Sequence, residues 1–229
     1  MLEYPARMSH LFSAADTPLA FALIGLLAGL VHALSGADHL SAVAPLVVEE
    51  RRRGWSTGLL WGLGHSLGVW GVGLLALALR GLLPVDRLSS FSERLVGAVL
   101  IGVGLWGLRR VWLARYPGGA GGSAAAAPHH HPLPARASLA ALWIGTLHGL
   151  AGSSHLLGVL PALALPSAAA SLAYVVAFGL GSIAAMVAFA SALGLVAVRL
   201  TAGGARAYQA LLATFSAVSI VVGGWWLLG

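Results

Sequence analysis

The chain has 229 residues, of which 59% are hydrophobic and only 9% are charged. Soluble domains carry roughly a quarter of their residues as charged side chains, so this composition excludes a soluble globular protein and predicts that lipid surrounds most of the chain. The formal net charge is +6, and all 13 basic residues are arginines. Because these arginines lie at the ends of apolar runs, where they set membrane topology, they do not indicate a nucleic-acid partner. Cysteine is absent, which excludes disulfides and thiolate metal sites.

Six hydrophobic segments follow an N-terminal segment, residues 1–17, which lacks the pattern of a cleaved signal peptide. A helix that spans a bilayer needs about 20 predominantly apolar residues. The first and fourth segments are longer than this and contain Gly and Ser near the middle, which predicts broken helices. We therefore expect an all-α, polytopic membrane protein with about six transmembrane helices. The segments are residues 18–48, 55–79, 93–112, 138–165, 168–198 and 207–228.

The two halves of the chain are related by an internal repeat. A first three-helix repeat, residues 18–115, and a second, residues 138–229, are joined by a flexible histidine-containing linker, residues 116–137. Three spans is an odd number, so the second repeat is expected to enter the membrane in the opposite orientation. Inverted repeats of this kind are typical of secondary transporters, with the site near the midplane. Eight of 18 positions agree when residues 29–46 are aligned with residues 145–162: Gly29/Gly145, His32/His148, Leu34/Leu150, Gly36/Gly152, His39/His155, Leu40/Leu156, Val43/Val159 and Pro45/Pro161.

The distribution of arginines predicts the orientation. Nine of the 13 arginines lie in the first, third and fifth connections, and the other four lie in the N-terminal segment or near the remaining connections. The positive-inside rule then places both termini outside and the linker in the cytoplasm. We expect a multi-pass protein of the cell inner (plasma) membrane.

Asp38 is the only acidic residue deep inside an apolar segment. An ionisable side chain there costs about 2.5–3.5 kcal/mol even on lenient insertion scales, and its default interpretation is a functional site. The alternative is a structural carboxylate that caps the helix restarting after Gly36, since Asp is a preferred N-cap residue. A capping Asp could still bind a ligand.

Histidines accompany this aspartate. His32 and His39 are seven residues apart, which separates them by about 10 Å along a straight helix, too far to share one ion. A break at Gly36 must therefore fold the chain back, or only one of the two histidines binds the ion directly and the other supports it. A lone membrane histidine is more often an interhelical hydrogen-bonding group than a ligand. Because five histidines occupy repeat-related or adjoining positions beside one aspartate, we favour a metal site with the candidate ligands His32, Asp38, His39, His65, His148 and His155.

The ligand types narrow the ion. Imidazole with carboxylate and no thiolate suits Ni²⁺, Co²⁺, Zn²⁺ or Cu²⁺, whereas Mg²⁺ and Ca²⁺ prefer oxygen ligands. These considerations do not choose among the four ions. The linker adds a histidine tract, His129, His130 and His131, which either binds metal weakly or is tolerated in a flexible segment.

Four motifs in chain order resemble those of the nickel/cobalt permeases and of the related urease-accessory-type membrane proteins. Residues 32–40 resemble the histidine–aspartate–histidine signature of that family, and residues 61–66 resemble its Gly-His-Ser motif in the next helix. Residues 147–153 and 178–182 look like its C-terminal motifs. The resemblance covers most of the chain, but the best-known permeases have one residue fewer between the first histidine and the aspartate, and usually eight spans. It implies metal binding at His32, Asp38 and His39.

The resemblance also implies a secondary transporter for Ni²⁺ or Co²⁺, by uptake or in some branches by efflux. The expected partners are the lipid bilayer, the divalent transition-metal ion and a metallochaperone or nickel-enzyme maturation system, with no nucleic acid. The metal ion is cargo here, and no prosthetic group is expected. One alternative is an intramembrane redox protein with axial histidines on haem. An intramembrane metalloprotease is disfavoured because His-Glu-x-x-His does not occur, and we expect no enzyme.

Overall fold

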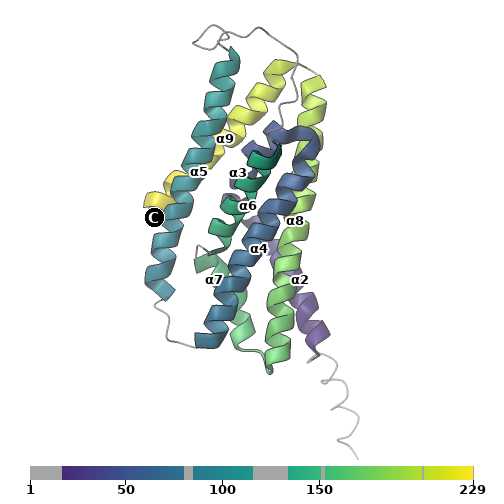
Figure 1. Cartoon of the computed structure of the whole chain (residues 1–229), viewed down its shortest axis with the longest axis vertical. Coiled ribbons are helices and arrows are strands. Elements are labelled where there is room, and N and C mark those ends of the chain that lie inside the picture. Colours follow the sequence, from purple (N-terminus) through teal and green to yellow (C-terminus); the bar gives the residue numbers. More distant parts are fainter. Residues whose placement is uncertain (1–16, 80–84, 116–133, 151–152, 203, 229) are drawn as a thin grey trace, which may run out of the picture.

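The computed structural model describes residues 17–79, 85–115, 134–150, 153–202 and 204–228 (Figure 1). Its regular structure over these ranges is entirely helical, without strands, which confirms the all-α class. The elements are α2 (Pro18–Ser35), α3 (Ala37–Glu50), the short 3-10 helix η1 (Arg51–Arg53), α4 (Gly54–Leu79), α5 (Val85–Arg115), α6 (Pro134–Leu150), α7 (Ser153–Leu163), α8 (Ala168–Ala202) and α9 (Ala205–Leu228).

Each predicted hydrophobic segment corresponds to one helix or to two consecutive helices. The first segment forms α2 and α3, and the fourth forms α6 and α7. Within the described ranges, four helical stretches are long and apolar enough to cross a membrane: Pro18–Ser35, Glu93–Arg115, Ala168–Ala202 and Ala205–Leu228. A chain with several such helices is a membrane protein by length and composition.

The break between α2 and α3 falls at Gly36, where the sequence predicted it. Gly36 has φ −74° and ψ 102°, an extended conformation that interrupts the helix, while its N–H still bonds the carbonyl of His32 at 3.1 Å. Gly36 is also the N-cap of α3, and Asp38 lies in the first turn. In that position its negative charge is favoured by the helix dipole.

Four helix pairs make the most extensive contacts: α2 with α8, α4 with α6, α4 with α8 and α5 with α9. Glycine permits close approach in these pairs. Gly29 of α2 faces the carbonyl of Phe178 on α8, and Gly145 of α6 faces the carbonyl of Trp61 on α4, so closely that a Cβ atom would collide with each carbonyl. Close approach at small residues is how helices associate in lipid.

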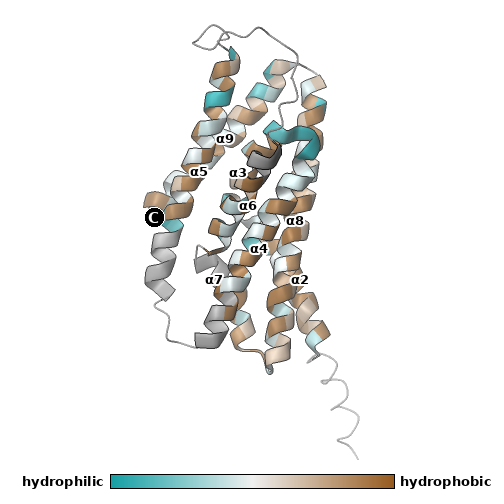
Figure 2. Ribbon diagram, in the orientation of Figure 1, coloured by the Kyte–Doolittle hydropathy of each residue, from teal (hydrophilic) through white to brown (hydrophobic). Residues whose placement is uncertain are grey.

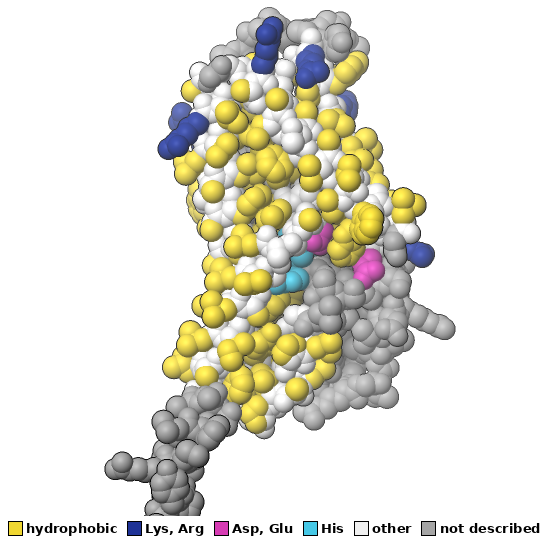
Figure 3. Space-filling model, turned by 180° about the vertical axis from the view of Figure 1, so that it is seen from behind, with side chains coloured by type: hydrophobic (Ala, Val, Ile, Leu, Met, Phe, Trp, Pro, Cys, Tyr) yellow, Lys and Arg dark blue, Asp and Glu magenta, His cyan; other side chains and the backbone are white. Residues whose placement is uncertain are grey.

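Apolar side chains cover the outside of the bundle as well as its core. Figure 2 shows hydrophobic residues along the described helices, and Figure 3 shows them over most of one described face. Trp225 is 78% exposed and Val221 is 71% exposed. Apolar exposure on this scale needs a lipid or protein environment. The interior holds equally apolar but tightly packed residues, the largest being Trp61, Phe178, Leu100, Met186 and Leu212.

Charged side chains gather at one end of the bundle, where α3 and α5 end and α9 begins. Glu49 bonds the guanidinium of Arg110 on α5 and accepts a 2.6 Å hydrogen bond from the Tyr208 hydroxyl on α9. Arg51 of η1 stacks over the Tyr208 ring, with its guanidinium carbon 4.1 Å from the ring centroid. We call this part of the molecule the arginine end. These contacts tie three helices together where hydrophobic packing alone would leave them free to slide.

Candidate metal centre

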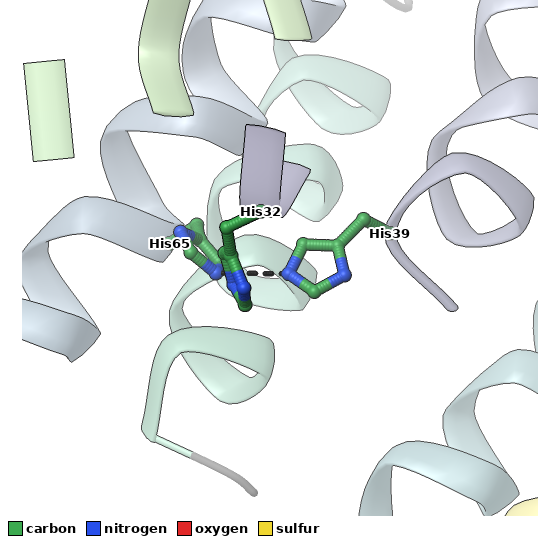
Figure 4. Close-up of side chains that lie close together, drawn as sticks. All are labelled: His32, His39 and His65. Atoms are coloured by element: carbon green, nitrogen blue, oxygen red, sulfur yellow. Dashed lines mark hydrogen bonds between the residues drawn. The ribbon is translucent and has the colours of Figure 1, made fainter. Parts of the chain in front are cut away.

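A cluster of histidines lies inside the bundle at the break between α2 and α3. His32 is in the last turn of α2, His39 is in the first turn of α3, and His65 comes from the middle of α4. Figure 4 shows the three imidazoles pointing toward one another from these separate elements. The break at Gly36 makes this possible, because it turns α3 away from the straight path that would separate His32 and His39 by two helical turns.

The three imidazoles are close enough to share one ion. One ligand atom from each lies within 4.8 Å of the others, and Nε2 of His39 lies 3.1 Å from Nε2 of His65. The ring centroids are 4.8 Å apart for His32 and His39, 4.9 Å for His39 and His65, and 5.8 Å for His32 and His65. Two imidazoles on a tetrahedral ion with bonds of about 2.1 Å have centroids about 5 Å apart. The nitrogens on such an ion stand about 3.4 Å apart. The set therefore fits a metal ion once Nε2 of His39 and Nε2 of His65 separate by a few tenths of an ångström and the more distant nitrogens close in by about an ångström.

Asp38 contacts the Nδ1 side of the His39 ring. Its Oδ1 accepts a 2.8 Å hydrogen bond from Nδ1–H of His39, and both side chains are buried. This bond fixes the ring tautomer that leaves the lone pair of Nε2 pointing at His65. Metal-binding histidines usually donate their other N–H to a carboxylate or carbonyl in this way, which orients the ring and raises its basicity.

His148 of α6 approaches the same cluster from the second half of the chain. Its ring centroid is 6.0 Å from that of His39, and the side chain is fully buried. Nδ1–H of His148 donates to the carbonyl of Ile144 at 3.1 Å, so Nε2 carries a lone pair. Among the described groups, Nε2 has no hydrogen-bond partner. A buried acceptor without a partner costs about 1–3 kcal/mol, which a bound ion would recover.

Two aromatic rings enclose the imidazoles. The indole of Trp61, four residues before His65 on α4, stacks on that imidazole with centroids 5.1 Å apart. Phe178 of α8 lies 5.2 Å from His32, centroid to centroid. Both rings are fully buried, so the cluster is walled by apolar surface and the polarity of the site resides in its histidines and Asp38. Low local polarity strengthens any interaction between an ion and these groups.

Five of the six predicted site residues come together: His32, Asp38, His39, His65 and His148. The side chain of His155 lies outside the described residues, as do His129, His130 and His131. In the structure the Asp38 carboxylate contacts the imidazole of the adjacent residue His39, and it is not one of the three groups that could share an ion. The two enclosing rings were not predicted. The spacing of Trp61 and His65, which puts both on one face of α4, was the available signal for the first of them.

Comparison with known proteins identifies two similar curated proteins, both from Arabidopsis thaliana. "Chloroplast protein FOR GROWTH AND FERTILITY 1" is 35% identical over 185 residues, which cover 78% of this chain and 50% of that protein. "Chloroplast protein FOR GROWTH AND FERTILITY 2" is 34% identical over 161 residues, which cover 70% of this chain and 43% of that protein. The chain thus spans about half the length of the curated relatives it matches. No family model matches the chain. No solved structure matches it either.

These findings overturn the expected family and function. The matched proteins carry names that refer to chloroplast growth and fertility rather than to metal permeases, so the assignment to the nickel/cobalt permeases is wrong. The expected uptake or efflux of Ni²⁺ or Co²⁺, which followed from that assignment, is wrong as well. The resemblance rested on short runs of Gly, His and Ser, and close helix packing around buried histidines favours such runs whatever the function.

The haem alternative falls with that function and also lacks support in the geometry. The Nε2 atoms of His39 and His65 are separated by 3.1 Å, a hydrogen-bond distance. Two axial nitrogens on one haem iron would stand about 4 Å apart, at a metal–nitrogen bond of about 2 Å each. The most closely facing pair of imidazoles therefore leaves no space for a macrocycle between them.

Proposed function

We propose that this chain is an integral membrane protein that holds a divalent transition-metal ion in a buried site formed by His32, His39 and His65. The observation that carries the proposal is the convergence of three imidazoles, within 4.8 Å of one another, from separate helical elements. A cluster of polar side chains is expensive to bury in an apolar bundle. Binding an ion compensates this cost through metal–nitrogen bonds.

The hydrogen bonds of the proposed ligands indicate which ring nitrogen carries each proton. His39 is held by Asp38 and presents Nε2, so the proton between His39 and His65 is carried by Nε2 of His65. An ion can bind Nε2 of His65 only after that proton has moved to Nδ1 of the same ring, so metal binding would change the tautomer of His65 without net release of a proton. Asp38 stays outside the coordination sphere and supplies the negative charge that a cation needs in a medium of low polarity.

His148 is the proposed fourth ligand. Its Nε2 has no hydrogen-bond partner among the described groups, its ring centroid lies 6.0 Å from that of His39, and it brings in α6. With His148 included, one ion would connect helices from both halves of the sequence. His155 stays a prediction. We propose that the centre is not enzymatic, and zinc-dependent hydrolysis of a peptide substrate by the purified protein would contradict this.

We further propose that the chain is built from two inverted three-helix repeats, over residues 18–115 and 138–229, with six spans. Reciprocal packing supports this. Gly29 meets Phe178 just as Gly145 meets Trp61, and Gly181 meets the carbonyl of Leu26 just as Gly64 meets that of Leu142. The partners in each pair are aligned by the repeat, at offsets of 116 or 117 positions. An experimental structure in which these pairs are not related by a two-fold axis would contradict the proposal.

We propose an orientation with the arginine end on the cytoplasmic side of an inner (plasma) membrane. Support comes from the arginines of the first, third and fifth connections, since Arg51 and Arg110 meet around Glu49 and Tyr208. The chain has no cysteine, so Ser123→Cys gives a single label site in the linker. Labelling of this cysteine by an impermeant reagent added outside intact cells would contradict the orientation.

Zinc content tests the metal proposal directly. Zn²⁺ suits imidazole ligands and has no redox chemistry, so it is the simplest probe. After equilibrium dialysis of the purified chain against micromolar Zn²⁺, we expect one tightly bound Zn²⁺ per chain. The triple variant His32→Ala, His39→Ala and His65→Ala is expected to retain none of it. Equal zinc in the two proteins would show that the histidine cluster does not bind the ion.

A further inference from the structure

A pocket of about 300 Å³ opens at the arginine end, away from the histidine cluster. It lies between η1, the first turn of α4 and the C-terminal half of α8. Its walls combine two arginines with apolar side chains and small residues. The lining residues that matter here are Arg51, Arg52, Trp55, Gly194, Leu195 and Val198. We call it the arginine pocket.

The backbone around this pocket is held in an uncommon conformation. Arg51 has φ 46°, the only positive φ of a non-glycine residue in the described part of the chain. Such backbone costs on the order of 1 kcal/mol or more and tends to occur at functional positions. The backbones of η1 and α8 meet at Gly194, since a Cβ atom there would lie 2.6 Å from the carbonyl oxygen of Arg51. Side chains at these positions are therefore set by a fixed turn.

The local charge is positive. Residues 49–53 and Arg110 together carry four arginines and two glutamates, which leaves an excess of two positive charges. Glu49 is already engaged by Arg110 and Tyr208. Nε of Arg51 is buried and makes no hydrogen bond within the described residues. Arginine guanidinium groups recognise phosphate oxygens strongly.

Apolar surface continues from the charged rim along α8. Leu195 is 62% exposed and Trp55 is 52% exposed. Trp commonly lies at the boundary between headgroups and hydrocarbon. Basic pockets beside transmembrane helices on the positively charged side are suited to anionic lipid headgroups. A soluble phosphate compound would use the arginines but would leave Leu195 and Val198 uncovered.

We propose that the arginine pocket binds the phosphate group of an anionic membrane lipid, with one acyl chain lying along Leu195 and Val198. The inference is independent of the metal centre. Phosphate recognition would fall to Arg51 and Arg52. A bound lipid would also brace η1 against α8.

Native mass spectrometry of the full chain in detergent tests this proposal with phosphatidylglycerol and phosphatidylcholine of identical acyl chains. We expect tighter binding of the anionic lipid, and a loss of about fivefold in its affinity for Arg52→Gln, the effect of roughly one arginine near an anionic headgroup. Arg52→Lys should lose less, because the charge remains. The matched control is Arg109→Gln, an exposed arginine of the same end that does not line the pocket, and it should change affinity by less than twofold.

Three results would overturn the proposal. Equal loss in Arg52→Gln and Arg109→Gln would mean that diffuse surface charge attracts the lipid without a pocket. Equal affinity for the two lipids would show that the pocket does not select an anionic headgroup, since phosphatidylcholine carries the same phosphate beside a choline cation. Displacement of phosphatidylglycerol by millimolar inorganic phosphate would identify a soluble phosphate as the ligand. Because Arg52 is exposed, both of its variants are expected to fold, and unchanged thermal unfolding without lipid checks this.

Discussion

Replacing His65 by Ala is expected to weaken Zn²⁺ binding on the order of 100-fold or more, or about 2.8 kcal/mol at 1.4 kcal/mol per tenfold change. His65 is the only imidazole that α4 contributes to the cluster, and its Nε2 lies 3.1 Å from that of His39. Without it, the two imidazoles from the α2–α3 break and the proposed fourth ligand His148 remain, and the ion is left open toward α4. The measurement is competition for Zn²⁺ against a chelator of known affinity.

Two variants keep this prediction separate from misfolding. His65 is fully buried and stacked on Trp61, so His65→Ala also removes packing, whereas His65→Gln keeps most of the volume and should lose binding to a similar extent. Replacing His129, His130 and His131 by Ser removes as many histidines as the triple variant of His32, His39 and His65 and should leave the tight Zn²⁺ in place. Wild-type affinity in His65→Gln, or loss of tight zinc only in the linker variant, would contradict the proposed ligand set.

Asp38→Asn is expected to lower Zn²⁺ affinity by about 10- to 100-fold, the usual effect of removing a group that orients a metal ligand. The asparagine carbonyl can still accept the hydrogen bond from Nδ1–H of His39, so the ring should keep its position. The negative charge that compensates the cation is lost. The same chelator competition measures the effect.

The size of this effect also separates two roles for Asp38. If the carboxylate were itself a ligand, Asp38→Asn would weaken binding as much as His65→Gln, and the number of coordinating atoms would fall. If it only orients His39, Asp38→Ala should be more damaging than Asp38→Asn, because alanine removes the hydrogen bond as well. Unchanged affinity in Asp38→Asn would remove Asp38 from the metal centre.

Hydrophobicity and glycine placement made the helices predictable. Runs of apolar residues marked the segments that became α2 to α9, and Gly36 marked the break because glycine there is not tied to helical backbone. The histidine spacing added an independent constraint, since His32 and His39 can approach one ion only if the helix is interrupted between them. Both arguments depend on local sequence, which is why they succeeded.

The sequence alone did not predict the tertiary contacts around the histidines, and it led to the wrong family and function. Phe178 contacts His32 although the two residues are 146 positions apart in the chain (178 minus 32), and no local sequence pattern predicts that contact. Asp38 was expected to be a ligand because it is the only acidic residue deep inside an apolar segment, yet the first turn of α3 puts it in hydrogen-bond contact with the adjacent His39. The motifs suggested a cargo, but imidazole and carboxylate groups select a class of ions and do not define what a protein does with them.

The most direct measurement of the metal centre is X-ray absorption at the zinc edge on the complex with one Zn²⁺ per chain. A site formed by His32, His39, His65 and His148 predicts three to four nitrogen or oxygen neighbours at about 2.0–2.1 Å, with the outer-shell scattering of imidazole rings. Asp38→Asn should leave that pattern unchanged, and His65→Gln should remove one imidazole from it. A shell of about six oxygens without imidazole scattering would show that zinc is held at the surface and that the buried histidines are not its ligands.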